Sequence, residues 1–367
     1  MCDNATLSER DNPYTRILTK MARQHRLFAV HWELTYRCNA TCAHCYLDVL
    51  PPRARADELT TGEIKNLLDQ IAALGGLHIT FSGGEIFLRR DFIAIAEHAR
   101  RKRLAIRLLT NGTLINSARA DRIAALHPTA VEISVYGADA ATHNTITRQP
   151  RSFELTLRAF HLLRARGVHL VMKTPLLREN VRQLGALRAL ASTVGARFQY
   201  DATLTAKDNG DATPLAHQLT FADLIELFRA EITAHDPAPR RESPRACGIG
   251  LSSLTIDPSG NIFPCVQTRI LAGNVRAQSL KKIWNAAPVL RELHALTWAA
   301  LPVCRACELR SLCARCHGIA RAERGDLRAP ARANCRVAVA RRQVMIEKKI
   351  LPPHFPIPAH LQEENFT

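Results

Sequence analysis

Three closely spaced cysteines mark the region of this chain with the clearest potential for chemistry. Cys38, Cys42 and Cys45 lie within the stretch RCNATCAHCY, in a C-x3-C-x2-C arrangement. Three thiolates on one short loop can hold three irons of a cubic iron–sulfur cluster and leave the fourth iron without a protein ligand. Structural zinc usually takes a closed set of four ligands, commonly supplied as C-x2-C pairs. The spacing therefore favours an iron–sulfur cluster with one open iron over zinc or three unrelated cysteines.

A glycine pair followed by a carboxylate is a second candidate site. Ser82, Gly83, Gly84 and Glu85 directly follow an expected strand. Glycine has no Cβ, so the backbone can approach a ligand closely, and Glu85 can accept a hydrogen bond from an ammonium group. A plain tight turn is the alternative.

Seven further cysteines follow residue 246. They occur in the order Cys247, Cys265, Cys304, Cys307, Cys313, Cys316 and Cys335. The run from Cys304 to Cys316 contains two C-x2-C pairs, a spacing that by itself favours a zinc ribbon. The chain has 11 cysteines in all. In a cytoplasmic protein so many cysteines indicate metal ligands or reactive thiols before disulfides.

The composition is that of a basic globular protein. Its 367 residues include 50 Lys and Arg against 33 Asp and Glu, a formal net charge of +17. The arginines are dispersed, which favours a solvated surface over attraction of an acidic protein or peptide, and both over nucleic acid. No apolar run approaches the roughly 18–20 residues that span a bilayer. Residues 1–28 lack the pattern of a secretory signal. We therefore expect a cytoplasmic protein that makes no use of a membrane.

Strands and helices alternate along the first two thirds of the chain. Short runs rich in β-branched and aromatic residues predict six strands, at Ala29–Thr35, Leu77–Phe81, Ala105–Leu109, Ala130–Val135, Val168–Lys173 and Arg197–Tyr200. Amphipathic stretches predict helices at Thr60–Leu74, Asp91–Lys102, Ser117–Leu126, Phe153–Arg166 and Val181–Val194, with a Thr60/Glu63 capping box at the first. This order predicts an α/β fold, a partial (β/α)6 TIM-like barrel. The cysteine loop and Ser82–Glu85 would then share the face at the carboxyl ends of the strands, where such barrels do chemistry.

The expected boundaries follow the same pattern. We assign an N-terminal segment to residues 1–28, the barrel to 29–235, a cysteine-rich extension to 236–348 and a tail to 349–367. A helix is expected at Tyr14–Gln24 and another at Thr220–Thr233. A linker is expected at Asp236–Arg245, and a hairpin from Leu251–Asp257 and Asn261–Pro264. The proline-rich end from Pro352 is expected to be loosely ordered.

The cysteine run resembles the signature of the radical S-adenosylmethionine (radical SAM) superfamily. Tyr46 matches its usual aromatic after the third cysteine, and Gly83-Gly84-Glu85 its Gly-Gly-Glu motif, with Ile86 where the family often has proline. The resemblance implies a 4Fe–4S cluster whose open iron chelates SAM. Reductive cleavage of SAM then yields a 5′-deoxyadenosyl radical that abstracts hydrogen from substrate.

The resemblance also implies further SAM contacts. Thr110-Asn111-Gly112 resembles the common Thr-Asn-Gly of the family, with a polar turn as the alternative. Ser134 and Arg148 correspond to residues that commonly bind the ribose and carboxylate of SAM, and an arginine suits a carboxylate. The implied cofactor-binding set is Tyr46, Ser82, Gly83, Gly84, Glu85, Asn111, Ser134 and Arg148.

The seven later cysteines resemble the SPASM extension of radical SAM enzymes, which carries auxiliary iron–sulfur clusters. The gap from Cys247 to Cys265 is somewhat long, and the last pair has two intervening residues where three are frequent. The resemblance implies one or two auxiliary 4Fe–4S clusters. One would be held by Cys304, Cys307, Cys313 and Cys335. The other would be held by Cys247, Cys265 and Cys316, with a fourth ligand that is not cysteine or with an open site.

The best match within the family is to peptide maturases such as the pyrroloquinoline-quinone and mycofactocin precursor enzymes. Ser134-Val135-Tyr136-Gly137 and the segment Asp201–Asp211 resemble that group. The resemblance implies crosslinking, oxidation or epimerisation of a ribosomally made peptide or protein. Val266 stands where sulfatase-maturing relatives have a carboxylate base. Asp201 and Asp208 are therefore our candidates for a base.

The implied partners are a precursor peptide or protein, a separate peptide-carrier protein and a low-potential electron donor such as flavodoxin or ferredoxin. Three alternatives remain open. One is a radical SAM enzyme of tetrapyrrole synthesis, for haem or haem d1. Another is an RNA-modifying enzyme, although no appended RNA-binding module is visible. The third is a zinc-stabilised binding protein without enzymatic activity.

Overall fold

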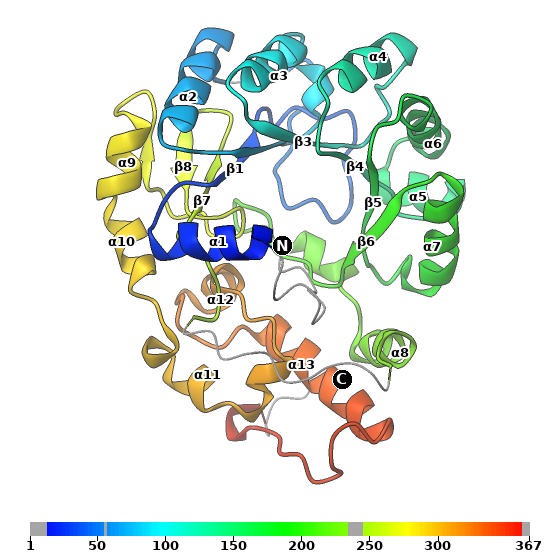
Figure 1. Ribbon diagram of the computed structural model, residues 1–367. Helices are drawn as coiled ribbons and strands as arrows, with labels where there is room; N and C mark the ends of the chain where they lie inside the picture. Colours follow the sequence, from blue (N-terminus) through cyan, green and yellow to red (C-terminus); the bar gives the residue numbers. More distant parts are fainter. Residues whose placement is uncertain (1–12, 55–56, 234–244, 362–367) are drawn as a thin grey trace.

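The computed structural model describes residues 13–54, 57–233 and 245–361. Residues 1–12 of the expected N-terminal segment and nearly all of the expected linker at Asp236–Arg245 lie outside these ranges. Within them, the strands form one curved nine-stranded sheet with the order β6-β5-β4-β3-β2-β1-β7-β8-β9 (Figure 1). The strands span Ala29–Glu33 (β1), His78–Ser82 (β2), Ala105–Thr110 (β3), Ala130–Ser134 (β4), Leu170–Pro175 (β5), Arg197–Asp201 (β6), Ser253–Ile256 (β7), Asn261–Phe263 (β8) and Gly273–Asn274 (β9).

The first six strands are parallel, as the sequence predicts for a partial barrel. The expected hairpin forms as β7 and β8. It is not a separate sheet, because β7 pairs in parallel with β1, with Ala29 opposite Ser253. The cysteine-rich part of the chain thus extends the barrel sheet beyond its first strand.

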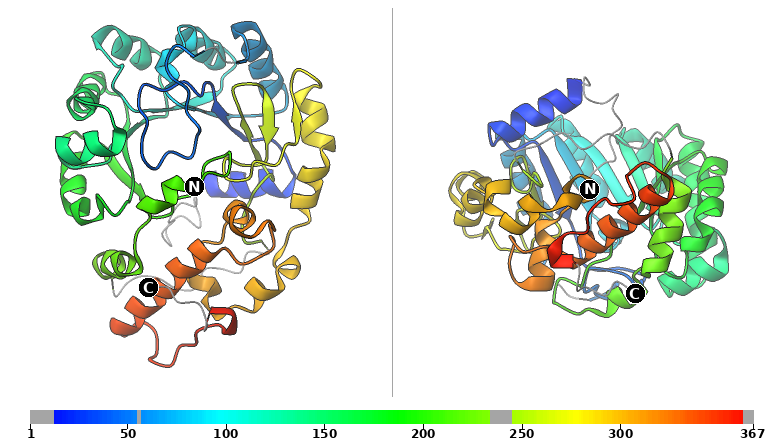
Figure 2. Two further views of the ribbon diagram at one scale, coloured as in Figure 1. Left: turned by 180° about the vertical axis from the view of Figure 1, so that it is seen from behind. Right: turned by 90° about the horizontal axis from the view of Figure 1, so that it is seen from below.

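The helices span Pro13–Arg23 (α1), Thr61–Ala73 (α2), Phe92–Arg101 (α3), Ser117–Ala125 (α4), Ala140–Thr147 (α5), Ser152–Arg164 (α6), Leu184–Thr193 (α7), Phe221–Glu231 (α8), Leu280–Ala286 (α9), Pro288–His294 (α10), Pro302–Ala306 (α11), His317–Arg324 (α12) and Arg332–Glu347 (α13). Those from α2 to α7 cover the outer face of this sheet, and a second group, which includes α8, α12 and α13, lies below it in Figure 1 (Figures 1 and 2). The predicted capping box of α2 is present, with Thr60 and Glu63 each bonded to the other's backbone.

Alternation along β1 explains how the sheet faces both a core and a site. Val30 and Trp32 are buried in the main hydrophobic core with Ile64 and Leu67 of α2. Glu33, one residue further on, points to the opposite face because side chains alternate along a strand. The outer face of the sheet therefore carries the packing energy, and the inner face is left for polar groups.

Two expectations are corrected by the structure. The stretch before Arg148, where no helix was expected, forms α5, whose start is capped by Asp139 accepting a hydrogen bond from the Thr142 amide. The tail is not loose as far as residue 361, because Leu361 is buried beside Leu309 and Phe355. None of the helices in the described ranges has the length and apolar character needed to cross a bilayer.

Candidate functional site

The loop of Cys38, Cys42 and Cys45 follows β1 at the carboxyl end of the sheet. All three thiols are free and half-buried. Backbone hydrogen bonds hold the loop, from the Thr41 amide to the Thr147 carbonyl (3.2 Å) and from the Ala43 amide to the Ile146 carbonyl (3.0 Å). The last turn of α5 is therefore the support on which the three-thiol loop rests.

The three thiols are held in an environment that disfavours thiolates until a cation is bound. Burial raises the pKa of Cys38 to about 12, and it also raises the pKa values of Cys42 and Cys45. Each of these thiols would gain a negative charge next to the other two. Iron bound to the loop would supply the positive charge that stabilises them, because a metal ion deprotonates its thiol ligands.

Gly83 and Gly84 press against the backbone that enters this loop. A Cβ on Gly84 would lie 2.3 Å from the Arg37 carbonyl oxygen, and one on Gly83 would lie 2.3 Å from the Thr35 carbonyl oxygen. The Gly84 amide donates a hydrogen bond to the Thr35 carbonyl oxygen (2.7 Å), and the Glu85 amide donates one to the Arg37 carbonyl oxygen (2.9 Å). Only glycine allows this approach, so the pair fixes the position of the cysteine loop relative to β2.

Glu85 is completely buried next to the end of β3. Its carboxylate accepts hydrogen bonds from the Thr110 hydroxyl (2.9 Å), the Asn111 amide (2.9 Å) and the Phe87 amide (3.1 Å). Burial raises its pKa against the effect of these donors. A cationic ligand beside Glu85 would favour the ionised form.

The remaining predicted SAM contacts divide into two groups. Asn111 is linked to the cysteine loop through Asn39 (2.9 Å). Ser134 ends β4 and bonds to the Tyr136 hydroxyl, which itself lies beside Cys42. Arg148 is exposed at the end of α5 with φ of +53°, and no hydrogen bond or ion pair joins it to the other described site residues. The structure therefore gathers Asn111 and Ser134 around the loop and leaves Arg148 at its margin.

A buried ion-pair network at the mouth of the barrel joins the predicted residues Tyr46 and Asp208 to two residues that the sequence did not single out. Glu33 is fully buried and accepts hydrogen bonds from the Tyr36 (3.0 Å) and Tyr46 (2.8 Å) hydroxyls. Arg269 pairs with it at 2.6 Å and also with Asp208 at 3.0 Å. An acidic residue at an inward position of a buried strand is the signal that could have revealed Glu33. Arg269 comes from far along the chain, so no local pattern indicates it.

The two candidate bases occupy different environments. Asp208 lies in this network, and its amide donates to the Tyr46 carbonyl (2.9 Å) directly after the cysteine run. Burial raises the pKa of Asp208 to about 6; Arg269 opposes this shift and Glu33 adds to it. Asp201 is exposed at the end of β6, and its carboxylate accepts a hydrogen bond from the nearby Thr203 amide. Asp208 is thus the candidate that the fold brings next to the three-thiol loop.

The polar interior continues below this network. Glu132 of β4 is buried and pairs with Lys173 (3.2 Å) and with Arg107 (3.1 Å). Lys173, at the end of the strand predicted over Val168–Lys173, therefore forms an ion pair with a buried carboxylate.

The later cysteines separate into two groups. Cys304, Cys307, Cys313 and Cys335 line one small cavity together with Arg315 and Asn334. Cys247, Cys265 and Cys316 do not line it. A Cβ on Gly318 would lie 2.1 Å from the Gln267 carbonyl oxygen, so α12 packs tightly against the loop of Cys265 and brings Cys316 toward it. In the described ranges, no three His, Cys, Asp or Glu side chains are grouped to hold a single metal ion.

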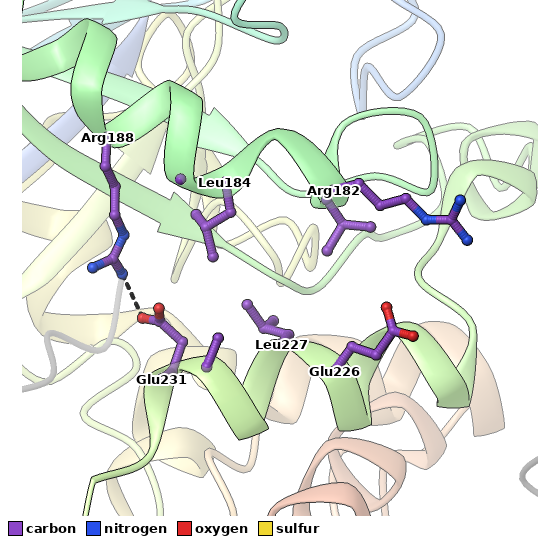
Figure 3. Close-up of a pocket in the computed structure, with 9 residues that line it drawn as sticks. Arg182, Leu184, Arg188, Glu226, Leu227 and Glu231 are labelled. Atoms are coloured by element: carbon purple, nitrogen blue, oxygen red, sulfur yellow. Dashed lines mark hydrogen bonds and ion pairs between the residues drawn. The ribbon is translucent and has the colours of Figure 1, made fainter.

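A separate pocket of about 300 Å³ lies between α7 and α8. Leu184 and Leu227 face each other across it, and an Arg188–Glu231 ion pair of 2.5 Å closes one end (Figure 3). None of the predicted site residues lines this pocket. It is therefore distinct from the cysteine sites.

Comparison with protein-family models gives two matches. The Radical SAM superfamily matches residues 32–191, and the iron–sulfur cluster-binding SPASM domain matches residues 247–308. The first covers the cysteine loop and five of the parallel strands. The second begins at Cys247. The alternative of a zinc-stabilised protein without enzymatic activity is therefore wrong.

The curated relatives of this chain are named for more than one enzymatic activity. AdoMet-dependent heme synthase of Methanosarcina barkeri is 28% identical over 335 residues, which is 83% of this chain and 95% of that protein. Mycofactocin maturase MftC of Mycobacterium ulcerans is 29% identical over 284 residues, covering 72% and 76%. PqqA peptide cyclase of Gluconobacter oxydans is 28% identical over 300 residues, covering 75% and 81%.

Solved structures share the fold at low identity. Native anSMEcpe with bound AdoMet superposes with a TM-score of 0.67 at 14% identity, covering 88% of this chain and 98% of that one. Streptococcus suis SuiB bound to precursor peptide SuiA superposes with a TM-score of 0.65 at 15% sequence identity. The match covers 91% of this chain and 84% of that one. The barrel and its cysteine-rich extension thus form one shared architecture. The chain belongs to the radical SAM superfamily, as an enzyme that uses SAM with a 4Fe–4S cluster and carries an auxiliary iron–sulfur SPASM domain.

Proposed function

We propose that this enzyme abstracts hydrogen from a ribosomally made peptide or protein and oxidises it, as a crosslink or a side-chain oxidation. Cys38, Cys42 and Cys45 would hold the SAM-binding cluster. The Glu85 carboxylate would accept a hydrogen bond from the ammonium group of SAM. The half-buried thiols and the fully buried Glu85 carboxylate fit these ligands. When bound, the cluster and SAM supply a 5′-deoxyadenosyl radical that removes a hydrogen atom from the substrate.

The position of Asp208 is the observation that carries the proposal of an oxidation. Oxidation of a substrate radical requires loss of one proton and one electron. Asp208 lies between the cysteine loop, through Tyr46, and the loop of Cys265, through Arg269. With a pKa raised to about 6 by burial, its carboxylate is ionised at neutral pH and suited to accept that proton. An epimerisation would instead need a hydrogen donor at this place.

The peptide assignment is supported by relatives with two distinct names, the mycofactocin maturase and the PqqA peptide cyclase, at 28–29% identity. The excess of basic residues also suits an acidic peptide. We further propose that a small carrier protein presents the peptide and that flavodoxin or ferredoxin supplies electrons.

The test uses anaerobically reconstituted enzyme with SAM, reductant and peptides encoded by neighbouring short reading frames. We expect a product that has lost the mass of two hydrogen atoms, formed together with 5′-deoxyadenosine. The Cys38, Cys42 and Cys45 triple-alanine variant should give neither. A product whose mass is unchanged in H2O but that gains a deuterium in D2O would instead indicate epimerisation and contradict the assigned role of Asp208.

A second candidate substrate is a tetrapyrrole that carries carboxylate side chains. It is favoured by the M. barkeri heme synthase, 95% of whose length aligns with this chain. The same reaction mixture with a propionate-bearing iron porphyrin in place of the peptide separates the two candidates. Product formation from the porphyrin, with peptides left unchanged, would replace the peptide proposal.

A further inference from the structure

Arg315 is a buried cation that touches a cysteine sulfur. Only 4% of the residue is exposed, and it lines the cavity shared by Cys304, Cys307, Cys313 and Cys335. Its Nε donates to the Cys304 sulfur at 3.3 Å. The guanidinium is thus in contact with a predicted ligand of an auxiliary cluster.

The other hydrogen-bond partners of Arg315 carry no negative charge. Its Nη2 donates to the carbonyl oxygens of Leu327 (2.8 Å) and Ala329 (2.9 Å), and Nη1 lies 2.6 Å from Nδ1 of His317. A guanidinium can only donate, so this Nδ1 accepts. Carbonyl oxygens and an imidazole cannot neutralise the charge of the guanidinium.

No carboxylate in the described ranges forms an ion pair with Arg315. Arg89 is buried to a similar degree, at 7% exposure, but it pairs with Asp91 at 2.8 Å and Glu58 at 3.3 Å. An uncompensated buried charge is strongly unfavourable. The surroundings of Arg315 therefore lack one negative charge, and the adjoining space is lined by four cysteines.

We propose that Arg315 is the counter-ion of the auxiliary 4Fe–4S cluster held by Cys304, Cys307, Cys313 and Cys335, and that it raises the reduction potential of that cluster. This inference rests on the ligand set predicted above. Four thiolates make such a cluster anionic, and one-electron reduction adds another negative charge. A fixed cation with an N–H bond to a ligand sulfur stabilises the reduced form more than the oxidised form. The cluster becomes a better acceptor for the electron that the substrate radical loses.

A purely structural role for Arg315 would leave the potential unchanged, so the potential is the decisive readout. The background is the Cys38, Cys42 and Cys45 triple-alanine variant, in which only auxiliary clusters remain. Arg315→Gln and Arg315→Lys are compared in it by iron analysis and by EPR-monitored redox titration. Arg305→Gln is the matched control, because it removes the same charge next to Cys304 from an exposed position.

We expect Arg315→Gln to shift one auxiliary signal to a more negative potential, Arg315→Lys to restore most of the shift, and Arg305→Gln to leave the potential near that of the parent. Loss of four irons per chain in Arg315→Gln but not in Arg315→Lys would also support a counter-ion.

Two results would overturn the inference. One is an unchanged potential in fully loaded Arg315→Gln. The other is an equal loss of iron from Arg315→Gln and Arg315→Lys while both apoproteins melt like the parent. The positive charge that Arg315→Lys keeps would then have no effect on cluster retention. If the parent itself holds no auxiliary iron, the predicted ligand set fails instead, and the two failures are thereby distinguished.

Discussion

The two cysteine regions differ in the balance of buried charge beside them. Beside the three-thiol loop, one cation, Arg269, is outnumbered by the buried or half-buried carboxylates Glu33, Glu85 and Asp208. The charged groups that line the four-cysteine cavity are cations, Arg310 and Arg315. SAM is a sulfonium with an ammonium group, whereas a cluster with four thiolates is an anion. The difference indicates that the first region is prepared for a cationic cofactor and the second for an anionic one.

The three-thiol loop and the loop of Cys265 each pack against a glycine. A glycine substitution can therefore disrupt one of these loops without the other. Gly84→Ala would bring a Cβ to 2.3 Å from the Arg37 carbonyl, and Gly318→Ala would bring one to 2.1 Å from the Gln267 carbonyl. We expect each variant to lose about four irons. The first should lose SAM cleavage, and the second should keep it while losing product formation.

Gly185→Ala is the control for both variants. This residue lies in α7 with nothing within 4 Å of an added Cβ, so iron content should be unchanged and stability should rise by about 0.5–1 kcal/mol. Equal iron loss in all three variants would show that the effect is not local.

Asp208, beside the three-thiol loop, should make product formation depend on pH. Protonation abolishes a general base, so product formation should fall as pH drops through about 6, the raised pKa of this carboxyl group. Asp208→Asn should lower the rate by roughly 10²–10⁴-fold and remove this acid limb. Product formation is measured between about pH 5 and 8. Asp201→Asn should retain the wild-type profile, and a profile retained in Asp208→Asn would refute the role.

Arg269 joins the loop of Cys265 to the barrel, and its loss leaves Glu33 buried without a cation. We expect Arg269→Gln to lower the free energy of unfolding of the apoprotein by about 3 kcal/mol, measured by urea denaturation. Arg276→Gln breaks exposed pairs with Asp57 and Glu63 and should cost less than about 1 kcal/mol. Equal midpoints for the two variants would contradict the structural importance of the Glu33 network.

A substitution at Glu85 tests whether a buried carboxylate at the three-thiol loop binds the cationic cofactor SAM. Glu85→Gln keeps the shape of the side chain but removes its charge, and a charge-assisted bond is worth roughly 1.5–3 kcal/mol. SAM should therefore bind about 10–100-fold more weakly by calorimetry. The exposed Glu97→Gln variant should bind SAM normally. Unchanged affinity in Glu85→Gln would separate Glu85 from SAM binding.

Local patterns predicted most of the barrel. The Thr60/Glu63 capping box and the six parallel strands are both present, because each is specified by neighbouring residues and a repeated period. The helix α5 was missed because Thr and Asn have low helix propensity, although Asp139 provides a recognisable cap.

Contacts between distant segments were beyond reach of the sequence. The pairing of β1 with β7 joins residues separated by more than half the chain. The pairing of Glu33 with Arg269 depends on the same closure. Arg315 lies between two predicted ligands, Cys313 and Cys316, but its missing carboxylate is visible only once its surroundings are known. The helices from α9 to α12 were not predicted either, since spans of 5 to 8 residues give little periodic signal. The 16-residue helix α13 was also missed, because its apolar and polar residues are not separated onto two faces.

The central claim is that the three-thiol loop supports reductive cleavage of SAM. The most direct measurement is the yield of 5′-deoxyadenosine from SAM and a strong reductant, with wild type compared to the Cys38, Cys42 and Cys45 triple-alanine variant after anaerobic reconstitution. The account predicts product from the wild type and none above background from the variant, which should still retain its auxiliary iron. Equal yields from the two proteins, or none from a wild type fully loaded with iron, would contradict it.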